Sequence, residues 1–238
     1  MKQILLLLFV AVLLPFGTPL HAQSGNKPEQ LTLDAFEQKL RTTTHPQILD
    51  VRTPAEFSEN HLKGAVNLSV ADSIGFKKGI SLLDKQQPVF VYSINNGRSG
   101  QVAKQLRNQG FSSVYELPGG IAHWLGAGKP VETKAGKGLA QQEYNQLVAS
   151  NELVLVEIGS KYCGGCKKLA PVVDTVVSEH ASTLKLVKIE LYDNRQLASQ
   201  LQIESVPTLI LYKNNKPVWR QSGGITKPEI EQALNKAL

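Results

Sequence analysis

Two cysteines are the residues of this chain best suited to chemistry. Cys163 and Cys166 are the only cysteines among 238 residues, and they stand as Cys-Gly-Gly-Cys between the apolar stretch 153–158 and a stretch of helical periodicity from 163 to about 180. A helix N-terminus offers partial positive charge and free backbone N–H groups, which stabilise a thiolate and lower its pKa. Their spacing puts Cys166 within disulfide reach of Cys163. We therefore predict that Cys163 attacks a disulfide and Cys166 resolves the mixed disulfide.

Two other uses of the cysteine pair are less well supported. A purely structural bridge would close a tiny loop and remove little entropy from the unfolded chain. A zinc site needs further ligands, but the chain has no third cysteine, and His180 is the only histidine in residues 139–238. The sequence therefore predicts redox chemistry with neither a metal nor a cofactor.

The stretch 89–100, VFVYSINNGRSG, has the form of a binding loop. Its first four residues predict a buried strand, and the following loop closes on Arg98. The backbone N–H groups of such a loop can hold an oxyanion together with the guanidinium. The candidate anion-binding residues are therefore Ser93, Asn96, Gly97 and Arg98.

Short apolar strands alternate with amphipathic helices along the chain, which predicts an α/β fold with mostly parallel, covered sheets. A glycine-rich stretch at 125–138 separates two different domains, for which we expect bounds of 27–133 and 139–238 with a linker at 134–138. We expect helices at 31–42, 99–109, 120–125, 139–149, 163–180 and 227–237, and strands at 47–51, 88–92, 113–116, 153–158, 184–190, 208–212 and 217–221.

The N-terminus predicts export. Lys2 precedes an apolar run at 4–14 and a small residue, Ala22, which is typical of a signal peptide over residues 1–22. The run is shorter than the roughly 20 residues that span a bilayer, so an uncleaved anchor is the less favoured alternative. We expect a periplasmic protein in a Gram-negative cell and a secreted protein otherwise, with the membrane involved only through export.

The formal net charge of +6 comes from basic and acidic residues scattered over the chain. No run of lysine or arginine and no docking motif accompanies this charge, so we expect no nucleic-acid partner.

Residues 139–238 resemble the thioredoxin family. The matching features are the Cys-x-x-Cys at a helix start, the continuation through Ala170, Pro171 and Asp174, the Val206-Pro207-Thr208 element, the hairpin at 213–217 and Gly223-Gly224. The resemblance implies a thioredoxin fold in which Pro207 is cis and packs against the cysteine pair. It also implies that the backbone of Val206 and the side chain of Tyr162, which precedes the first cysteine, contact the substrate.

Glu157 and Lys188 are candidates for handling the thiol proton. A buried carboxylate beside a thiol has a raised pKa and can accept and return its proton. Glu157 lies on a strand that reads as buried, although a solvent-facing place at the strand end is the alternative. The family resemblance implies that Glu157 and Lys188 occupy a buried acid and a buried lysine position, and we count both as catalytic together with the two cysteines.

Residues 28–133 resemble the rhodanese family over a full α/β domain with a parallel sheet. The first signature contains Asp50, Arg52, Glu56-Phe57, His61, Gly64-Ala65 and Asn67, and the closing signature covers 117–132. Ser93 stands where the family has its sulfur-carrying cysteine, with Arg98 at the expected spacing. A serine hydroxyl ionises far above neutral pH and does not carry sulfur, so we expect no sulfurtransferase activity and a role in ligand or partner binding.

The whole sequence therefore predicts an exported thiol–disulfide oxidoreductase, a reductase or isomerase of protein disulfides that serves cell redox homeostasis. Its expected partners are disulfide-containing proteins, a membrane or soluble thiol redox partner, and a small anion at the N-terminal loop. Two alternatives stay open: an anion- or sulfur-binding redox adaptor, and a sulfur relay in which Cys163 accepts sulfur from a molecule held at Arg98. The sequence leaves open the direction of thiol exchange.

The residues between the cysteines predict the redox potential. Gly164-Gly165 replaces the Gly-Pro usual in the family, which removes a pre-set φ at the helix start and costs about 1 kcal/mol per glycine within a helix. We expect a potential less reducing than that of a Cys-Gly-Pro-Cys thioredoxin, measured by equilibrating the purified protein with glutathione buffers. A potential equally low would contradict this expectation.

Overall fold

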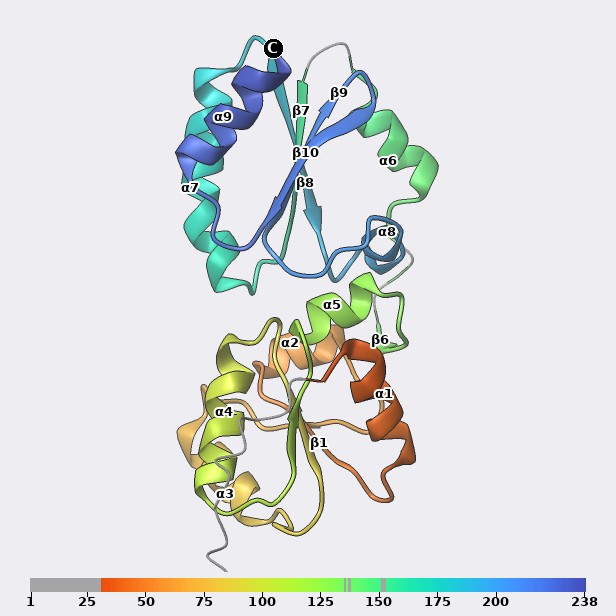
Figure 1. Cartoon of the computed structure of the whole chain (residues 1–238), viewed down its shortest axis with the longest axis vertical. Helices are drawn as coiled ribbons and strands as arrows, with labels where there is room; N and C mark the ends of the chain where they lie inside the picture. The colour runs from red at the N-terminus through yellow and green to blue at the C-terminus, as the bar shows by residue number, and fades with distance from the viewer. Residues whose placement is uncertain (1–30, 135, 137, 151–152) are drawn as a thin grey trace, which may run out of the picture.

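The computed structural model describes residues 31–134, 136, 138–150 and 153–238, so the expected signal peptide at 1–22 lies outside the described residues. Two α/β domains are stacked along the long axis of the molecule (Figure 1). Among the helices of the described part, none is long and apolar enough to cross a bilayer.

The N-terminal domain has a parallel sheet with strand order β3-β1-β4-β5. All four residues of the central strand β4 are buried, because helices cover both faces of the sheet: Phe90 and Tyr92 join one core cluster, and Val89 and Val91 join another. The strands are β1 (Gln47–Asp50), β3 (Val66–Asn67), β4 (Val89–Tyr92) and β5 (Val114–Glu116), and the helices are α1 (Leu33–Thr42), α2 (Pro54–Glu59), α3 (Ser73–Ser81), α4 (Gly97–Asn108) and α5 (Gly120–Gly126).

The C-terminal domain has a mixed sheet with strand order β10-β9-β7-β8. Only β7 and β8 are parallel, which corrects the expectation of mostly parallel sheets for this domain. A tight turn with positive φ at Asn214 and Asn215 leads β9 directly back into β10, so these strands pair antiparallel. The strands are β7 (Leu153–Gly159), β8 (Leu184–Glu190), β9 (Thr208–Lys213) and β10 (Lys216–Ser222), and the helices are α6 (Gln141–Val148), α7 (Gly164–Glu179), α8 (Arg195–Gln200) and α9 (Lys227–Ala237).

The elements that the sequence analysis missed are short. They are α2, α3, α8, β3 and the two-residue strands β2 (Asn60–His61) and β6 (Glu132–Thr133), which pair with each other. One of them has a clear signal, because Thr53 caps α2 and forms a capping box with Glu56. The pairing of β6 with β2 and the burial of Leu125 and Gly126 place the first part of the glycine-rich stretch 125–138 inside the N-terminal domain.

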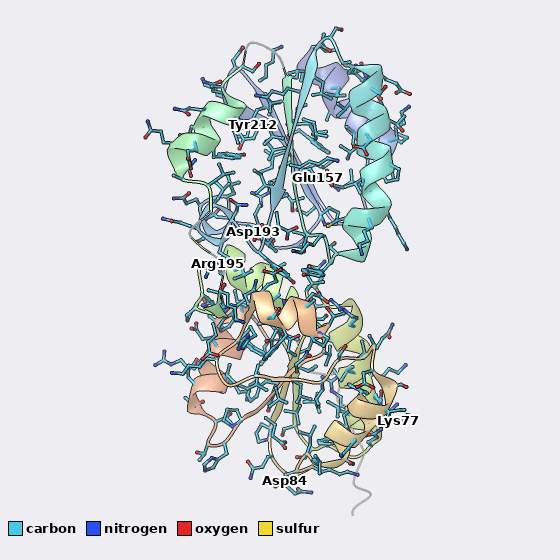
Figure 2. All side chains as sticks on the ribbon, turned by 180° about the vertical axis from the view of Figure 1, so that it is seen from behind. Lys77, Asp84, Glu157, Asp193, Arg195 and Tyr212 are labelled. Atoms are coloured by element: carbon cyan, nitrogen blue, oxygen red, sulfur yellow. The ribbon has the colours of Figure 1, made fainter. Side chains whose placement is uncertain are left out.

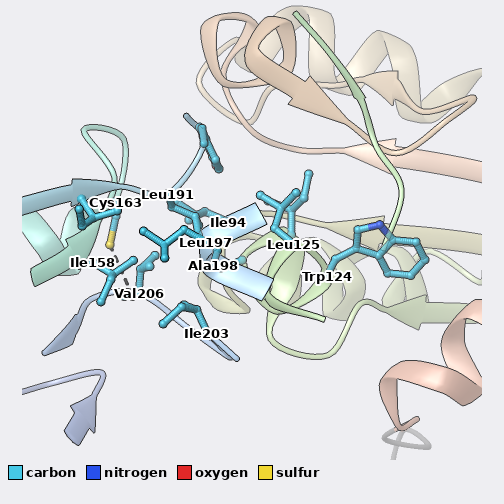
Figure 3. Packing of buried hydrophobic residues seen from close by; sticks show 14 of the residues in the cluster. Ile94, Trp124, Leu125, Ile158, Cys163, Leu191, Leu197, Ala198, Ile203 and Val206 are labelled. Atoms are coloured by element: carbon cyan, nitrogen blue, oxygen red, sulfur yellow. Dashed lines mark hydrogen bonds between the residues drawn. The ribbon is translucent and has the colours of Figure 1, made fainter. Parts of the chain in front are cut away.

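The two domains meet where α5 faces α8 (Figure 1). Glycine permits this approach, because a Cβ at Gly126 would lie only 1.7 Å from the carbonyl oxygen of Ile203. One cluster of buried side chains runs through the boundary, with members from both domains (Figure 3). The labelled members include Ile94, Trp124 and Leu125 from the N-terminal domain and Leu191, Leu197, Ala198, Ile203 and Val206 from the C-terminal domain.

A buried arginine also joins the domains. Arg52 has no exposed surface, and its guanidinium donates to both carboxylate oxygens of Asp50 and to the backbone oxygen of Asn60. Its Nη1 atom donates to the hydroxyl of Tyr192 in the C-terminal domain at 2.9 Å. A buried cation must be paired and hydrogen-bonded. The hydrogen bond to Tyr192 therefore adds an acceptor for the Arg52 guanidinium that the N-terminal domain does not supply.

Candidate functional site

The cysteine pair lies at the start of α7, as the sequence predicts. Cys163 is the N-cap residue with extended backbone angles, and its Sγ accepts a hydrogen bond from the backbone N–H of Cys166 at 3.1 Å. An N-cap side chain that accepts from a free N–H normally belongs to serine, threonine or aspartate. Here a sulfur takes that place, so the helix N-terminus acts directly on the reactive atom.

The two thiols have opposite electrostatic environments. The hydrogen bond from the Cys166 thiol holds the pKa of Cys163 below its usual range, at about 7, and the backbone N–H groups of Cys166 and Gly165 contribute to this despite burial. The same thiol–thiol hydrogen bond, together with burial, raises the pKa of Cys166. Of the two thiols, Cys163 therefore has the larger thiolate fraction at neutral pH, while Cys166 stays protonated.

Glu157 lies on the Cys166 side of the pair, within the C-terminal domain (Figure 2). It is 7% exposed and shares with Cys166 the lining of an open pocket of about 350 Å³. Burial raises the pKa of Glu157, with Lys188 acting against this and Asp174 adding to it. Its Oε2 atom is buried and accepts no hydrogen bond.

Lys188 pairs in register with Glu157 across β8 and β7, but it does not occupy a buried position. Its side chain is 52% exposed, which corrects the expectation of a buried lysine. The ammonium lies 4.0 Å from Glu157 Oε2 and 3.0 Å from Asp174 Oδ1 at the pocket rim. The ammonium can therefore interact with Glu157 when that carboxyl group is ionised, and it remains in contact with water.

Pro207 follows a cis peptide bond, as the resemblance implies, and lies against the cysteine pair. A Cβ at Gly165 would come within 3.2 Å of Pro207 Cδ, so the absence of a side chain at Gly165 allows Pro207 to pack closely. The carbonyl oxygen of the preceding residue, Val206, lies 3.6 Å from Cys163 Sγ. These residues form the wall beside the nucleophilic sulfur.

Tyr162 faces the N-terminal domain. Its hydroxyl donates to Glu59 Oε1 at 3.2 Å, and its ring centre lies 6.0 Å from that of Tyr192. Lys161 contacts the same carboxylate oxygen of Glu59 at 3.0 Å. A side chain predicted to touch substrate is therefore engaged by the other domain.

The predicted anion-binding residues lie together in the loop between β4 and α4, but their polar groups are paired internally. The buried Ser93 hydroxyl donates to Asn95 O at 2.5 Å and accepts from Ser99 N at 3.2 Å. Asn96 donates to Glu116 and accepts from the backbone N–H of Gly119, while a Cβ at Gly97 would meet nothing within 4 Å.

Arg98 directs its guanidinium at a carboxylate of its own domain. Its two terminal nitrogens donate to the two oxygens of Glu56 at 2.8 and 2.6 Å. Burial raises the pKa of Glu56, but hydrogen bonds from Arg98 and Thr53 outweigh this and hold it below its usual range. The two guanidinium donors that an oxyanion would need are thus already bound to the ionised carboxylate of Glu56.

Asn95 is the site residue that the sequence analysis missed. Its Nδ2 atom donates to the carbonyl oxygen of Val206 at 2.8 Å, across the domain boundary. An asparagine in a Gly-containing loop is ordinary turn chemistry, so the sequence carries no signal for this contact. Among the described residues, no group of three histidine, cysteine, aspartate or glutamate side chains could hold a metal ion.

Comparisons with known proteins agree with this division of the chain. A family model described as Thioredoxin matches residues 136–236, and one described as Rhodanese-like domain matches residues 32–127. Thioredoxin of Porphyra purpurea is 38% identical over 94 residues, which are 39% of this chain and 88% of that protein. Thioredoxin 1 of a Nostoc species is 36% identical (39% and 87%), and thioredoxin of Haemophilus influenzae is 32% identical (40% and 89%).

The pH dependence of alkylation tests the environment of Cys163. Iodoacetamide reacts with thiolates, so its rate at Cys163 should rise with pH through about 7 and then level off, while Cys166 stays unmodified until the protein unfolds. Mass spectrometry of the alkylated chain gives both rates. Cys166→Ala removes the thiol that donates to Cys163 and should move the midpoint upward. A wild-type midpoint near the ordinary cysteine value of about 8.5 would contradict the assignment.

Proposed function

The chain belongs to the thioredoxin family through its C-terminal domain, and on that premise we propose an exported thiol–disulfide oxidoreductase that reduces or isomerises protein disulfides. The observation that carries the proposal is the N-cap hydrogen bond from Cys166 N to Cys163 Sγ. Together with the hydrogen bond from the Cys166 thiol, it lowers the pKa of Cys163 to about 7, while the same thiol–thiol hydrogen bond and burial keep Cys166 protonated.

The exchange proceeds in two balanced steps. The Cys163 thiolate attacks one sulfur of the substrate disulfide, so that a Cys163–substrate bond forms as the substrate S–S bond breaks and the leaving thiolate takes up a proton. Cys166 then loses its proton and attacks Cys163 Sγ, which releases the second substrate thiol and leaves a Cys163–Cys166 disulfide. Two electrons pass from protein to substrate, and a thiol or dithiol redox partner must restore the pair.

Glu157 is the proposed proton acceptor in the second step. Glu157 lines the pocket that Cys166 also lines, its Oε2 accepts no hydrogen bond, and its raised pKa matches it better to a thiol proton than an ordinary carboxylate. Lys188 is a positioning residue, because its ammonium lies between Glu157 and Asp174 and adjusts the charge of the carboxylate.

We propose that the rhodanese-like domain is inactive as a sulfurtransferase and serves in binding. The serine in place of a cysteine supports this, as does the internal pairing of its hydroxyl with Asn95 and Ser99. A small anion at this loop stays a prediction, because Arg98 must leave Glu56 before it can bind one. The same ion pair disfavours the adaptor and sulfur-relay alternatives.

The location is part of the proposal. The signal-peptide pattern at residues 1–22 supports export to the periplasm of a Gram-negative cell, or secretion otherwise. Outside the cytosol, a lone Cys-Gly-Gly-Cys dithiol at a helix N-terminus is suited to exchange with the disulfides of other exported proteins.

Serine substitutions test the function. In an insulin-reduction assay, Cys163→Ser should abolish turnover because the nucleophile is lost. Cys166→Ser should leave the first step intact and accumulate mixed disulfides with substrate, detected by non-reducing electrophoresis and mass spectrometry. Each variant serves as the control for the other. Unchanged turnover in both would remove the basis for the oxidoreductase proposal.

Glu157→Gln tests the proton acceptor. We expect turnover to fall about tenfold, less than general acid–base catalysis typically contributes, because water enters the open pocket and can take the proton. In the wild type, turnover should rise with pH as Glu157 ionises, and this limb should disappear in the variant. The matched control is Glu179→Gln, at the exposed end of α7 and about 20 Å along that helix from Cys166. Equal pH profiles for Glu157→Gln and the wild type would contradict the role.

A further inference from the structure

The sulfur of Cys163 lies buried near the boundary with the chain's own N-terminal domain. Cys163 is 2% exposed although it stands at a helix start, and it belongs to the buried cluster that continues through Ile94 (Figure 3). Tyr162, immediately before it, contacts Glu59. A disulfide within a polypeptide therefore cannot reach the buried Cys163 sulfur in this arrangement unless the side chains around it move.

The carbonyl of Val206 is a main-chain hydrogen-bond acceptor beside the place where a substrate must lie. Its oxygen is 3.6 Å from Cys163 Sγ, so a disulfide attached to that sulfur brings the flanking peptide groups of the substrate beside it. A backbone N–H of the substrate is the natural donor for such an acceptor, in the manner of strand addition. A small disulfide without peptide groups has no equivalent donor.

Asn95 already supplies a donor to this carbonyl. Its side-chain amide is the same chemical group as a peptide N–H, and it reaches the oxygen at 2.8 Å from the loop between β4 and α4. We infer that Asn95 is a specificity-determining residue: it competes with the substrate backbone for the Val206 carbonyl and so disfavours polypeptide disulfides relative to small disulfides that lack peptide groups. This inference rests on the proposed oxidoreductase function.

The placement of Asn95 is built into the fold. The loop follows β4 directly, and the start of α5 holds it through hydrogen bonds from Ile121 N to Ser93 O and from Ala122 N to Ile94 O. Helix α5 in turn meets the backbone of Ile203, three residues before Val206, at Gly126. The contact between α5 and Ile203 therefore positions the loop that holds Asn95 relative to the segment that holds Val206.

Asn95→Ala removes the competing donor and tests the inference in the full-length chain. We compare the second-order rates of the reduced protein with insulin and with 5,5′-dithiobis(2-nitrobenzoate), an aromatic disulfide without peptide groups. The ratio of the insulin rate to the aromatic rate should rise roughly fivefold, as expected for freeing one neutral hydrogen-bond acceptor. Asn95→Leu keeps most of the bulk and lacks the donor, and it should raise the ratio as well. Asn108→Ala, on the exposed end of α4, is the matched control and should leave the ratio unchanged.

Gly126→Ala is a second way to free the Val206 carbonyl for the substrate. Its Cβ would meet the rigid backbone of Ile203, so the domains should part and both rates should rise roughly fivefold or more. Adding Asn95→Ala to Gly126→Ala should then change the ratio little, because the hydrogen bond from Asn95 to Val206 is already broken. Gly100→Ala, where a Cβ finds only ordinary contacts with Glu116, controls for adding a methyl group to a helix of this domain.

The outcomes separate this inference from the proposed function. If the wild type and all variants exchange neither disulfide, the oxidoreductase proposal fails. If both disulfides react through Cys163 but Asn95→Ala and Asn95→Leu keep the wild-type ratio, the oxidoreductase proposal stands and the role of Asn95 is overturned.

Discussion

The desolvated guanidinium of Arg52 is the constraint on which the arrangement of the two domains depends. A charge with no exposed surface must have its hydrogen bonds satisfied, and Asp50 and the backbone of Asn60 satisfy only part of them. The remaining donor reaches Tyr192 in the other domain. Because Arg52 and the loop at 93–98 both follow neighbouring strands of one parallel sheet, the contact that satisfies the arginine also brings the loop to the cysteine pair.

The reactive site combines an activated sulfur with restricted access. The start of α7 lowers the pKa of Cys163, and Glu157 lines an open pocket beside Cys166. These features belong to the C-terminal domain, on which the proposed thiol exchange rests. The loop at 93–98 belongs to the N-terminal domain, and its polar groups are paired internally through Ser93 and Arg98. A domain whose loop lacks a cysteine thus contacts, through Asn95, the segment beside the reactive sulfur of its neighbour.

Much of this could be predicted from sequence, because local patterns carry it. The position of Cys163 at a helix start and the burial of Glu157 follow from the Cys-x-x-Cys motif and strand periodicity, and the cis bond before Pro207 follows from the resemblance to the thioredoxin family. The contacts between the domains could not be predicted. Asn95 and Val206 are 111 residues apart, and nothing in either residue type distinguishes an interdomain hydrogen bond from an ordinary loop amide and an apolar core residue. The exposure of Lys188 could not be predicted either, because it depends on how the lysine side chain extends toward Asp174.

The central claim is that the two domains form one cooperative unit closed over the cysteine pair, and equilibrium unfolding in urea tests it most directly. In a Trp219→Phe variant, Trp124 fluorescence reports on the N-terminal domain alone, while alkylation of Cys166 in the same urea series reports on the C-terminal domain. We predict that the two transitions coincide, as they must for a two-state unit. Separate transitions, with Cys166 becoming reactive at a urea concentration different from the one that exposes Trp124, would contradict the account.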